Sequence, residues 1–271
     1  MRHGIHFISG LPRSGSTLLA ALLRQNPRFH TRMSGPVAGW FGTMLNEMSG
    51  RNEYEVFISD AQRRAVLRGL FEGYYHDVHP HKVVFDTNRS WCTRLPALAE
   101  LYPDAKVICC VRHVGWIMDS IERLVRRNRF RVSRMFNFDS GGTVYSRIGG
   151  LAEPSGLVGF SLNAVREAYY GEQSDRLLLV TYESLSRSPA AVLDAVYGFI
   201  GEPPFVHDFD HLAYDEAEFD DRLGMPGLHS VAAKVCHTER QPLLPPDLFA
   251  RFVNDAFWTD PRLNVRKVKV V

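Results

Sequence analysis

Short apolar runs alternate with longer amphipathic segments along most of the chain. Strands are predicted for four of these runs, at 5–9, 82–86, 106–111 and 176–182. All but the first are almost continuously apolar, which is typical of parallel strands covered on both faces. Helices are predicted at 15–25, 60–78, 91–102, 114–127, 158–173 and 189–200. This alternation predicts an α/β fold, a P-loop-type and mostly parallel sheet flanked by helices.

Two stretches depart from the alternation. Residues 128–157 are rich in Gly, Ser, Arg and aromatic residues, and an irregular segment of that length is typical of a lid or an acceptor-binding loop. Residues 203–271 carry prolines and acidic residues without a clear period. Because no flexible linker precedes them, we expect a C-terminal extension packed on the same domain, so that residues 1–271 form a single domain.

Composition narrows the functional classes. The formal net charge of the 271 residues is +2, which does not favour nucleic acid as a partner, so an anion site must come from local clustering of cations. No apolar run approaches the roughly 20 residues of a membrane-spanning helix, and the first residues lack the pattern of a signal peptide. The four cysteines (Cys92, Cys109, Cys110, Cys236) contain no C-x-x-C pair. We expect a reduced, cytoplasmic protein with buried Cys109 and Cys110.

The first predicted strand leads into a loop with the spacing of a phosphate-binding loop. From Gly10 it reads G-x-x-x-x-G-S-T, with Ser16 where a nucleoside triphosphatase has Lys. A helix beginning there points its free N–H groups and positive dipole end at an anion. We therefore predict that a phosphate or sulfate is bound by the residues Arg13, Ser14, Gly15, Ser16 and Thr17.

Three blocks of sequence resemble the sulfotransferases that use 3′-phosphoadenosine-5′-phosphosulfate (PAPS). They are "GLPRSGSTLLAALLRQNP", "KVICCVRHVGWIMDSIERL" and "LLLVTYESLSRSP", and they occur in the order of that family. The P-R-S-G loop is closer to the tyrosylprotein and carbohydrate branches than to the cytosolic branch. The resemblance implies transfer of a sulfuryl group from PAPS to an acceptor hydroxyl, which leaves a sulfate ester and 3′-phosphoadenosine-5′-phosphate (PAP).

The same resemblance implies roles for individual residues. Arg112 ends a strand and Ser120 follows eight residues later, the spacing of the 3′-phosphate site, while Tyr182 matches the tyrosine near the adenine. In "LHSVAAKV" (228–235), Ser230 and Lys234 resemble the residues that fold back over the cofactor. Physical chemistry agrees for Arg112, because a cation at the carboxyl end of a parallel strand lies on the ligand-binding edge of such a sheet.

For catalysis the sequence predicts Arg13 as the group that stabilises charge on the leaving 5′-phosphate. The acceptor hydroxyl needs a general base. Where the family has a Lys and often a His, this chain reads "VVFDTNRSW". Asp86 is therefore the candidate base and Arg89 the candidate partner of the transferring group, although the family motif is not matched here.

Two other functions remain open from the sequence. A P-loop kinase or nucleoside triphosphatase would use ATP with magnesium held by Asp86, but Ser16 replaces its Lys. A catalytically inactive nucleotide-binding protein is the other alternative. The histidines show no metal-ligand spacing, so we expect no metal. The acceptor, whether small molecule, carbohydrate, carrier-bound chain or protein, is not specified, and a homodimer is only a family-level expectation.

Overall fold

A six-stranded sheet forms the centre of the described residues, which are 4–50, 52–136, 142–214 and 216–271 of a computed structural model. The strand order is β2-β3-β1-β4-β5-β6, and every neighbouring pair is parallel. The strands are β1 (Ile5–Gly10), β2 (Phe29–Thr31), β3 (Val83–Thr87), β4 (Val107–Val111), β5 (Leu177–Thr181) and β6 (Lys269–Val270). The predicted α/β fold with a parallel sheet is confirmed.

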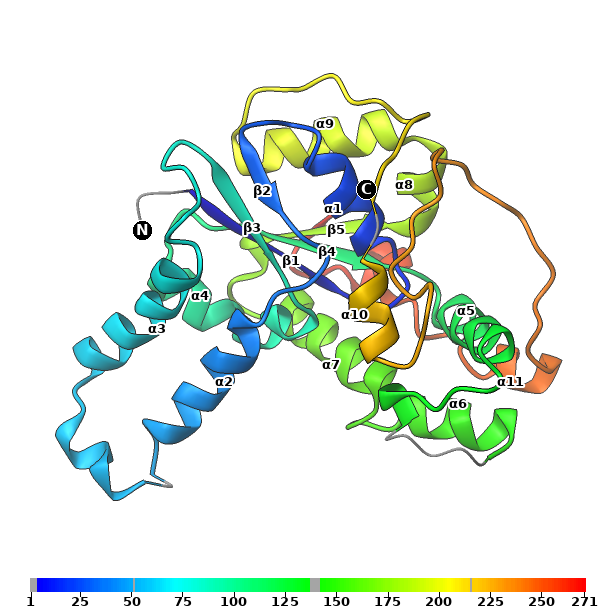
Figure 1. Ribbon diagram of the computed structural model, residues 1–271, viewed down its shortest axis with the longest axis horizontal. Coiled ribbons are helices and arrows are strands. Elements are labelled where there is room, and N and C mark those ends of the chain that lie inside the picture. Colours follow the sequence, from blue (N-terminus) through cyan, green and yellow to red (C-terminus); the bar gives the residue numbers. More distant parts are fainter. Residues whose placement is uncertain (1–3, 51, 137–141, 215) are drawn as a thin grey trace.

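Helices flank this sheet, and Figure 1 shows α2 and α3 projecting away from its edge as an arm. The α-helices are α1 (Ser16–Leu23), α2 (Val37–Glu47), α3 (Asp60–Tyr74), α4 (Leu95–Leu101), α5 (Val114–Arg127), α6 (Val144–Ala152), α7 (Leu157–Tyr170), α8 (Tyr182–Arg187), α9 (Pro189–Ile200), α10 (Ala217–Arg222) and α11 (Pro246–Ala250). The 3-10 segments Arg89–Arg94 (η2) and Arg134–Phe136 (η3) complete the connections used below.

Both faces of the sheet are buried, because successive side chains of a strand point to opposite faces. On one face, Phe7 and Leu179 pack in a cluster with residues of α2, α3, α5 and α7. On the other, Ile8 and Leu178 pack against α1, α8 and α9. This two-sided cover explains why the sequence of the inner strands is almost continuously apolar.

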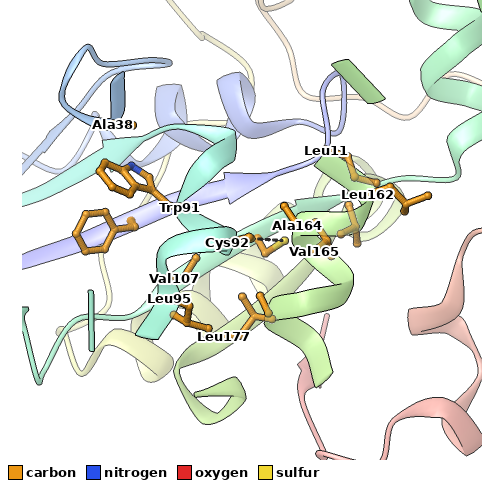
Figure 2. Packing of buried hydrophobic residues seen from close by; sticks show 14 of the residues in the cluster. Leu11, Ala38, Trp91, Cys92, Leu95, Val107, Leu162, Ala164, Val165 and Leu177 are labelled. Carbon is orange, nitrogen blue, oxygen red and sulfur yellow. Dashed lines mark hydrogen bonds between the residues drawn. The ribbon is translucent and has the colours of Figure 1, made fainter. Parts of the chain in front are cut away.

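Figure 2 shows the packing beneath the segment after β3. Trp91 and Cys92 of η2 are fully buried, and α7 contributes Ala164 and Val165 to the same cluster. The thiols of Cys92 and Cys109 lie 3.8 Å apart and are free. The expectation of buried thiols at Cys109 and Cys110 is confirmed.

Several elements differ from the prediction. β2 and β6 are too short to leave a pattern in the sequence, and the strand predicted to end at 182 ends at Thr181, where Tyr182 begins α8. The segment 128–157 is not one irregular loop, since α6 forms within it. Thr143 caps α6 by accepting from the backbone N–H of Ser146, whose side chain reaches back to Thr143. Residues 137–141 of the predicted lid lie outside the described residues.

The C-terminal segment 203–271 contributes to both the sheet and the core. β6 pairs with β5, and Val271 N donates to the Leu179 carbonyl at 2.9 Å. Tyr214, Leu248 and Trp258 are buried in the hydrophobic clusters. Across the described ranges, no helix has both the length and the apolar content needed to cross a bilayer.

The strand order creates a crevice at the carboxyl ends of the neighbouring strands β1 and β4. The connection that leaves β1 leads toward the β3 side, whereas the one that leaves β4 leads toward β5. Loops diverge at such a switch point, and ligands of open α/β sheets bind outside the carboxyl ends of these strands. The loops after β1 and β4, which contain Arg13 and Arg112, meet there.

Candidate functional site

A cavity of about 350 Å³ lies at the carboxyl ends of the inner strands. The segments after four strands contribute to its wall: residues 10–13 and 15–17 after β1, Asn88 and Arg89 after β3, Arg112 after β4 and Tyr182 after β5. Residues 228–240 of the C-terminal segment form the remaining side. Of the predicted site residues, Arg13, Gly15, Ser16, Thr17, Arg89, Arg112, Ser120, Tyr182, Ser230 and Lys234 line this one cavity.

The loop after β1 has the backbone geometry of an anion-binding turn. Arg13 and Gly15 adopt left-handed conformations with φ of 57° and 96°, and left-handed residues in such turns aim successive N–H groups at one point. Gly10 is required for a different reason, since a Cβ there would lie 2.1 Å from the Cys110 carbonyl oxygen. α1 begins at Ser16, so its first N–H groups have no carbonyl partner within the helix.

Two arginines meet beside this loop. Arg13 Nε donates to Ser120 Oγ at 3.1 Å, and Arg13 Nη1 donates to the Leu228 carbonyl. The Arg112 guanidinium lies over the Tyr182 ring, 3.9 Å from its centroid, and donates to the Arg13 carbonyl at 3.4 Å. Desolvation and the neighbouring Arg112 charge lower the pKa of Arg13 to about 10, so the Arg13 guanidinium still carries its charge at neutral pH.

These cations lack anionic partners. Within the part of the chain that the structure describes, Arg13, Arg89 and Arg112 form no salt bridge. Arg112 Nε is also buried without a hydrogen-bond acceptor. Bringing like charges together and leaving a donor unpaired are both unfavourable. An anion bound in the cavity would offset both costs.

Ser14 does not donate its hydroxyl to a ligand as predicted. Its side chain is fully buried, and Oγ donates to the carbonyls of Leu11 at 2.5 Å and Cys110 at 2.8 Å. The hydroxyl therefore fixes the loop to β4 and is turned away from the cavity.

Asp86 also does not occupy the position predicted for a general base. It lies within β3, is fully buried and is not part of the cavity wall. Tyr75 Oη donates to Asp86 Oδ2 at 2.7 Å and Trp91 Nε1 donates to Oδ1 at 2.8 Å. Both carboxylate oxygens are thus engaged by core groups, and the sequence pattern could not show which side of the sheet Asp86 faces.

Replacing Asp86 is therefore expected to change stability more than chemistry. In Asp86→Ala, the buried donors of Tyr75 and Trp91 lose their acceptors, which should lower the free energy of unfolding by about 2–5 kcal/mol. Urea denaturation measures this, with the exposed Asp77→Ala as the control, expected within about 0.5 kcal/mol. The milder Asp86→Asn tests the chemistry: a folded Asn variant whose turnover fell about 10²-fold or more would restore Asp86 as the base.

The predicted residues of the C-terminal segment reach the cavity but are engaged within the chain. Ser230 Oγ donates to the Gly227 carbonyl at 3.1 Å. Lys234 Nζ pairs with Asp210 at 2.7 Å, and its side chain is 68% exposed. Lys234 thus contributes positive charge to the cavity rim, partly neutralised by Asp210.

Sequence reasoning missed a histidine–aspartate pair in the cavity wall. His229 lies next to Ser230 and lines the cavity, and its Nδ1 is 2.5 Å from Oδ1 of the buried Asp220. The backbone N–H of His229 donates to Asp220 Oδ2 at 2.8 Å. Asp220 and His229 lie nine positions apart in a part of the sequence without a clear period. The sequence therefore gave no sign of the pair, apart from the position of His229 beside Ser230.

The hydrogen bond to Asp220 determines which ring nitrogen of His229 is free to accept a proton. Because the Asp220 carboxylate accepts from Nδ1–H, the lone pair lies on Nε2, which has no hydrogen-bond partner among the described residues. Burial lowers the pKa of His229 from 6.5, and Arg13 and Arg89 also lower it, against the opposing effect of Asp220. The imidazole is therefore neutral at physiological pH and able to accept a proton.

Arg240 is a second residue that the sequence did not reveal. It lines the cavity and pairs with the buried Asp119 at 3.1 Å. Its guanidinium also lies 5.7 Å from the Trp116 ring. Asp119 also accepts from the backbone N–H of Leu243, three residues further along the chain. The pairing fastens the C-terminal segment to α5 beside Ser120.

Comparisons with known proteins identify the family and the fold of the chain. Residues 6–208 match the model of the sulfotransferase family, while no curated protein matches the sequence. The sulfotransferase domain from the curacin biosynthetic pathway has a TM-score of 0.51 at 19% identity, and the match covers 75% of each chain. The sulfotransferase from Alicyclobacillus acidocaldarius has a TM-score of 0.51 at 18% identity over 82% of this chain and 90% of that one. These structures show the same fold, and because the family model spans most of the chain, this protein belongs to the sulfotransferase family.

Proposed function

We propose that the protein transfers a sulfuryl group from PAPS to an acceptor hydroxyl and releases PAP. The observation that carries the proposal is a group of three arginines, Arg13, Arg89 and Arg112, which have no acidic partner among the described residues and lie on one cavity with the loop after β1. A donor with two separate phosphate positions requires cations at two places. Arg13 and the loop provide one place, and Arg112 with Ser120 provides the other.

The residues present fit a 3′-phosphate. Arg112 Nε is a buried donor without an acceptor, and its guanidinium plane is held against Tyr182. A rigid guanidinium fork of this kind binds phosphate oxygens in pairs. Ser120 Oγ, which now accepts from Arg13, and the second cation Arg240 lie at the same wall. We assign the 3′-phosphate to Arg112 and Ser120, and the adenine side to Tyr182.

The 5′ side of the donor belongs to the loop after β1. There the first N–H groups of α1 and the hydroxyls of Ser16 and Thr17 would surround the leaving phosphate. Arg13 now donates to two neutral acceptors, Ser120 Oγ and the Leu228 carbonyl. A phosphate oxygen is a stronger acceptor than either. Arg13 would stabilise the charge that develops on the leaving oxygen as the sulfur–oxygen bond breaks.

His229 replaces Asp86 as our candidate for the general base. Its Nε2 would take the proton of the acceptor hydroxyl while the acceptor oxygen bonds to sulfur, and Asp220 would stabilise the resulting imidazolium. Arg13 donates to the carbonyl of the preceding residue, Leu228, which keeps His229 beside the loop. Arg89, unpaired on the same cavity, would bind the transferring sulfuryl oxygens.

Apolar side chains also contribute to the cavity wall. Met33, Met135 and Leu157 are among them, so the group that carries the hydroxyl should include an apolar part. The P-R-S-G loop is the feature that favours the tyrosylprotein and carbohydrate branches, and we propose that relationship on this loop alone.

Calorimetry with PAP, ATP and ATP plus magnesium tests the donor assignment. We expect micromolar binding of PAP in the presence of EDTA and little binding of ATP, because ATP has no 3′-phosphate for Arg112. Adenosine 5′-phosphosulfate is the matched control, since it keeps the 5′ group and lacks only the 3′-phosphate. Magnesium-dependent ATP binding without a preference for PAP would instead indicate a kinase-like protein.

A further inference from the structure

A second cavity, of about 250 Å³, lies outside the proposed active site, and we call it the side cavity. Its walls come from α5, the turn between α6 and α7, α7 itself and the chain just after α11. α5 contacts α11 and α6 contacts α7, and Figure 1 shows α5, α6 and α11 on the opposite side of the molecule from the arm of α2 and α3. Among the described residues, none lines both cavities, so a molecule in the side cavity would not occupy the donor site.

The deep side of the side cavity is apolar. It is lined by Val114 and Met118 of α5, Val158 and Leu162 of α7, and Phe252 after α11. These five side chains are buried. Contact with such a surface removes apolar ligand atoms from water, which favours the binding of a hydrocarbon group.

The wall at the turn between α6 and α7 is formed by a close approach of the two helices. A Cβ on Gly159 would lie 2.1 Å from the Glu153 carbonyl oxygen, so the first turn of α7 packs directly on the end of α6. Gly156 N donates to the same carbonyl at 2.8 Å. Pro154, within this turn, lines the side cavity. A wall held in this way is in place before a ligand binds, which lowers the cost of ordering on binding.

Polar side chains surround the mouth of the side cavity. Arg166 pairs with Asp255 at 3.2 Å, and both side chains are partly exposed. Arg251 and Asn163 also line the cavity and are exposed. In the parts of the chain that the structure describes, the Arg251 guanidinium has no acidic partner and the Asn163 amide has no hydrogen-bond partner. The Arg251 guanidinium lies 5.6 Å from the centroid of the Phe252 ring, so this charge is next to the apolar side.

The charges at the mouth leave an excess of one positive charge. Two guanidinium groups, of Arg166 and Arg251, and one carboxylate, of Asp255, line the cavity. An anion with a single charge would balance this excess, with Arg251 as its partner, because Arg166 is already paired. A guanidinium fork binds a carboxylate through two parallel hydrogen bonds, and the Asn163 amide can donate another.

We propose that the side cavity binds a small monocarboxylate with an apolar chain, such as octanoate. The carboxylate would bind Arg251 and Asn163 at the mouth, and the chain would lie against Met118 and Phe252. The volume of about 250 Å³ is below the roughly 300–1,000 Å³ of sites for drug-sized ligands, which suits a single unbranched chain. The proposal is independent of sulfuryl transfer, because none of these residues takes part in that reaction.

Ligand-observed NMR titrations with octanoate test the proposal. Octanamide is the matched probe, since it has the same chain and lacks the charge. We expect octanoate to bind about fivefold more tightly than octanamide at low salt. In the series butanoate, hexanoate and octanoate, affinity should rise about two- to fourfold per added methylene, because each methylene is removed from water on the deep side of the cavity.

Three variants locate the site. Arg251→Glu should weaken octanoate binding about tenfold and abolish its advantage over octanamide. Lys267→Glu makes the same charge change on an exposed residue that lines neither cavity and should leave octanoate affinity within about twofold. Arg112→Ala changes the donor cavity instead and should also leave octanoate affinity within about twofold. The urea midpoint of each variant reports on folding.

Four outcomes would overturn the proposal. The first three are no binding of octanoate to the wild type at millimolar concentration, equal affinity for octanoate and octanamide, and unchanged octanoate affinity in Arg251→Glu. The fourth is a loss of octanoate affinity in Arg112→Ala without a loss in Arg251→Glu, which would place the carboxylate in the donor cavity. All four leave the proposed transfer reaction untouched, since calorimetry with PAP tests it separately.

Discussion

Arg112→Ala is expected to weaken PAP binding by about 10²-fold, because hydrogen bonds to a charged group contribute roughly 1.5–3 kcal/mol each. The guanidinium of Arg112 has a buried Nε without an acceptor and is held flat on the Tyr182 ring, so it is already oriented for a phosphate. Affinity for adenosine 5′-phosphosulfate should fall by less than about threefold, since the missing 3′-phosphate removes the interaction from both proteins. Calorimetry with the two nucleotides measures the difference.

Two variants accompany this measurement. Arg112→Lys keeps the charge but loses the fork, and should recover only part of the affinity for PAP. Arg64→Ala removes an exposed arginine of α3, which pairs with Glu100 far from the cavity wall, and should leave both affinities unchanged. Equal losses for PAP and adenosine 5′-phosphosulfate in Arg112→Ala would remove Arg112 from the 3′-phosphate role.

His229→Gln is expected to lower turnover by about 10²- to 10⁴-fold while PAP affinity stays near that of the wild type. Gln retains a hydrogen-bonding side chain but cannot accept the proton of the acceptor hydroxyl. Asp220→Asn should also lower turnover, because the Nδ1–H of His229 then loses its carboxylate partner and the lone pair is no longer confined to Nε2. Initial rates at saturating donor, together with calorimetry, separate chemistry from binding.

The chain offers a matched control for this pair. His211 Nδ1 lies 2.9 Å from Asp208 Oδ2, but His211 is 85% exposed and does not line the cavity. His211→Gln should therefore keep wild-type turnover. Wild-type turnover in His229→Gln as well would mean that the proton is accepted elsewhere.

The pH dependence of turnover should follow the titration of His229. The pKa of His229 is lowered from 6.5, first by burial, and the neutral form is the one that accepts a proton. The value of kcat/KM should therefore be constant around neutral pH and fall only as pH drops through that lowered pKa. In Asp220→Asn, the fall in kcat/KM on the acid side should occur at lower pH than in the wild type, since Asp220 is the group that raises the pKa of His229.

The sequence predicted the central sheet well for a local reason. β3, β4 and β5 are buried on both faces, so their composition is nearly continuous in apolar residues and can be recognised without knowing their neighbours. α5 and α9 were predicted at their observed bounds. The amphipathic period of a helix and the residues at its two ends can also be recognised in a short stretch of sequence. β2 and β6, with three and two residues, carry no such period.

The donor side of the candidate site could be predicted because its residues follow strands directly. Arg13 and Arg112 lie in the first residues after predicted parallel strands, and Tyr182 is the last residue of another. Since the carboxyl ends of parallel strands share one edge, strand order was not needed to bring these residues together.

The proposed base could not be predicted in this way. Asp86 is within a strand, and only the packing of Tyr75 and Trp91 shows that its carboxylate is turned into the core. His229 and Asp220 come from a segment without regular period, which is held beside the cavity because Asn128 donates to the Pro226 carbonyl and Arg13 to the Leu228 carbonyl.

The sequence by itself thus determined the fold class, the position of the loop after β1 with Arg13, and the position of Arg112 after β4, because each depends on residues adjacent in the chain. Only the tertiary structure decided that Ser14 and Asp86 serve the framework and that His229 faces the cavity. The direction of a side chain in a buried strand or an irregular segment depends on contacts with residues distant in sequence, and such contacts leave no pattern in the chain itself.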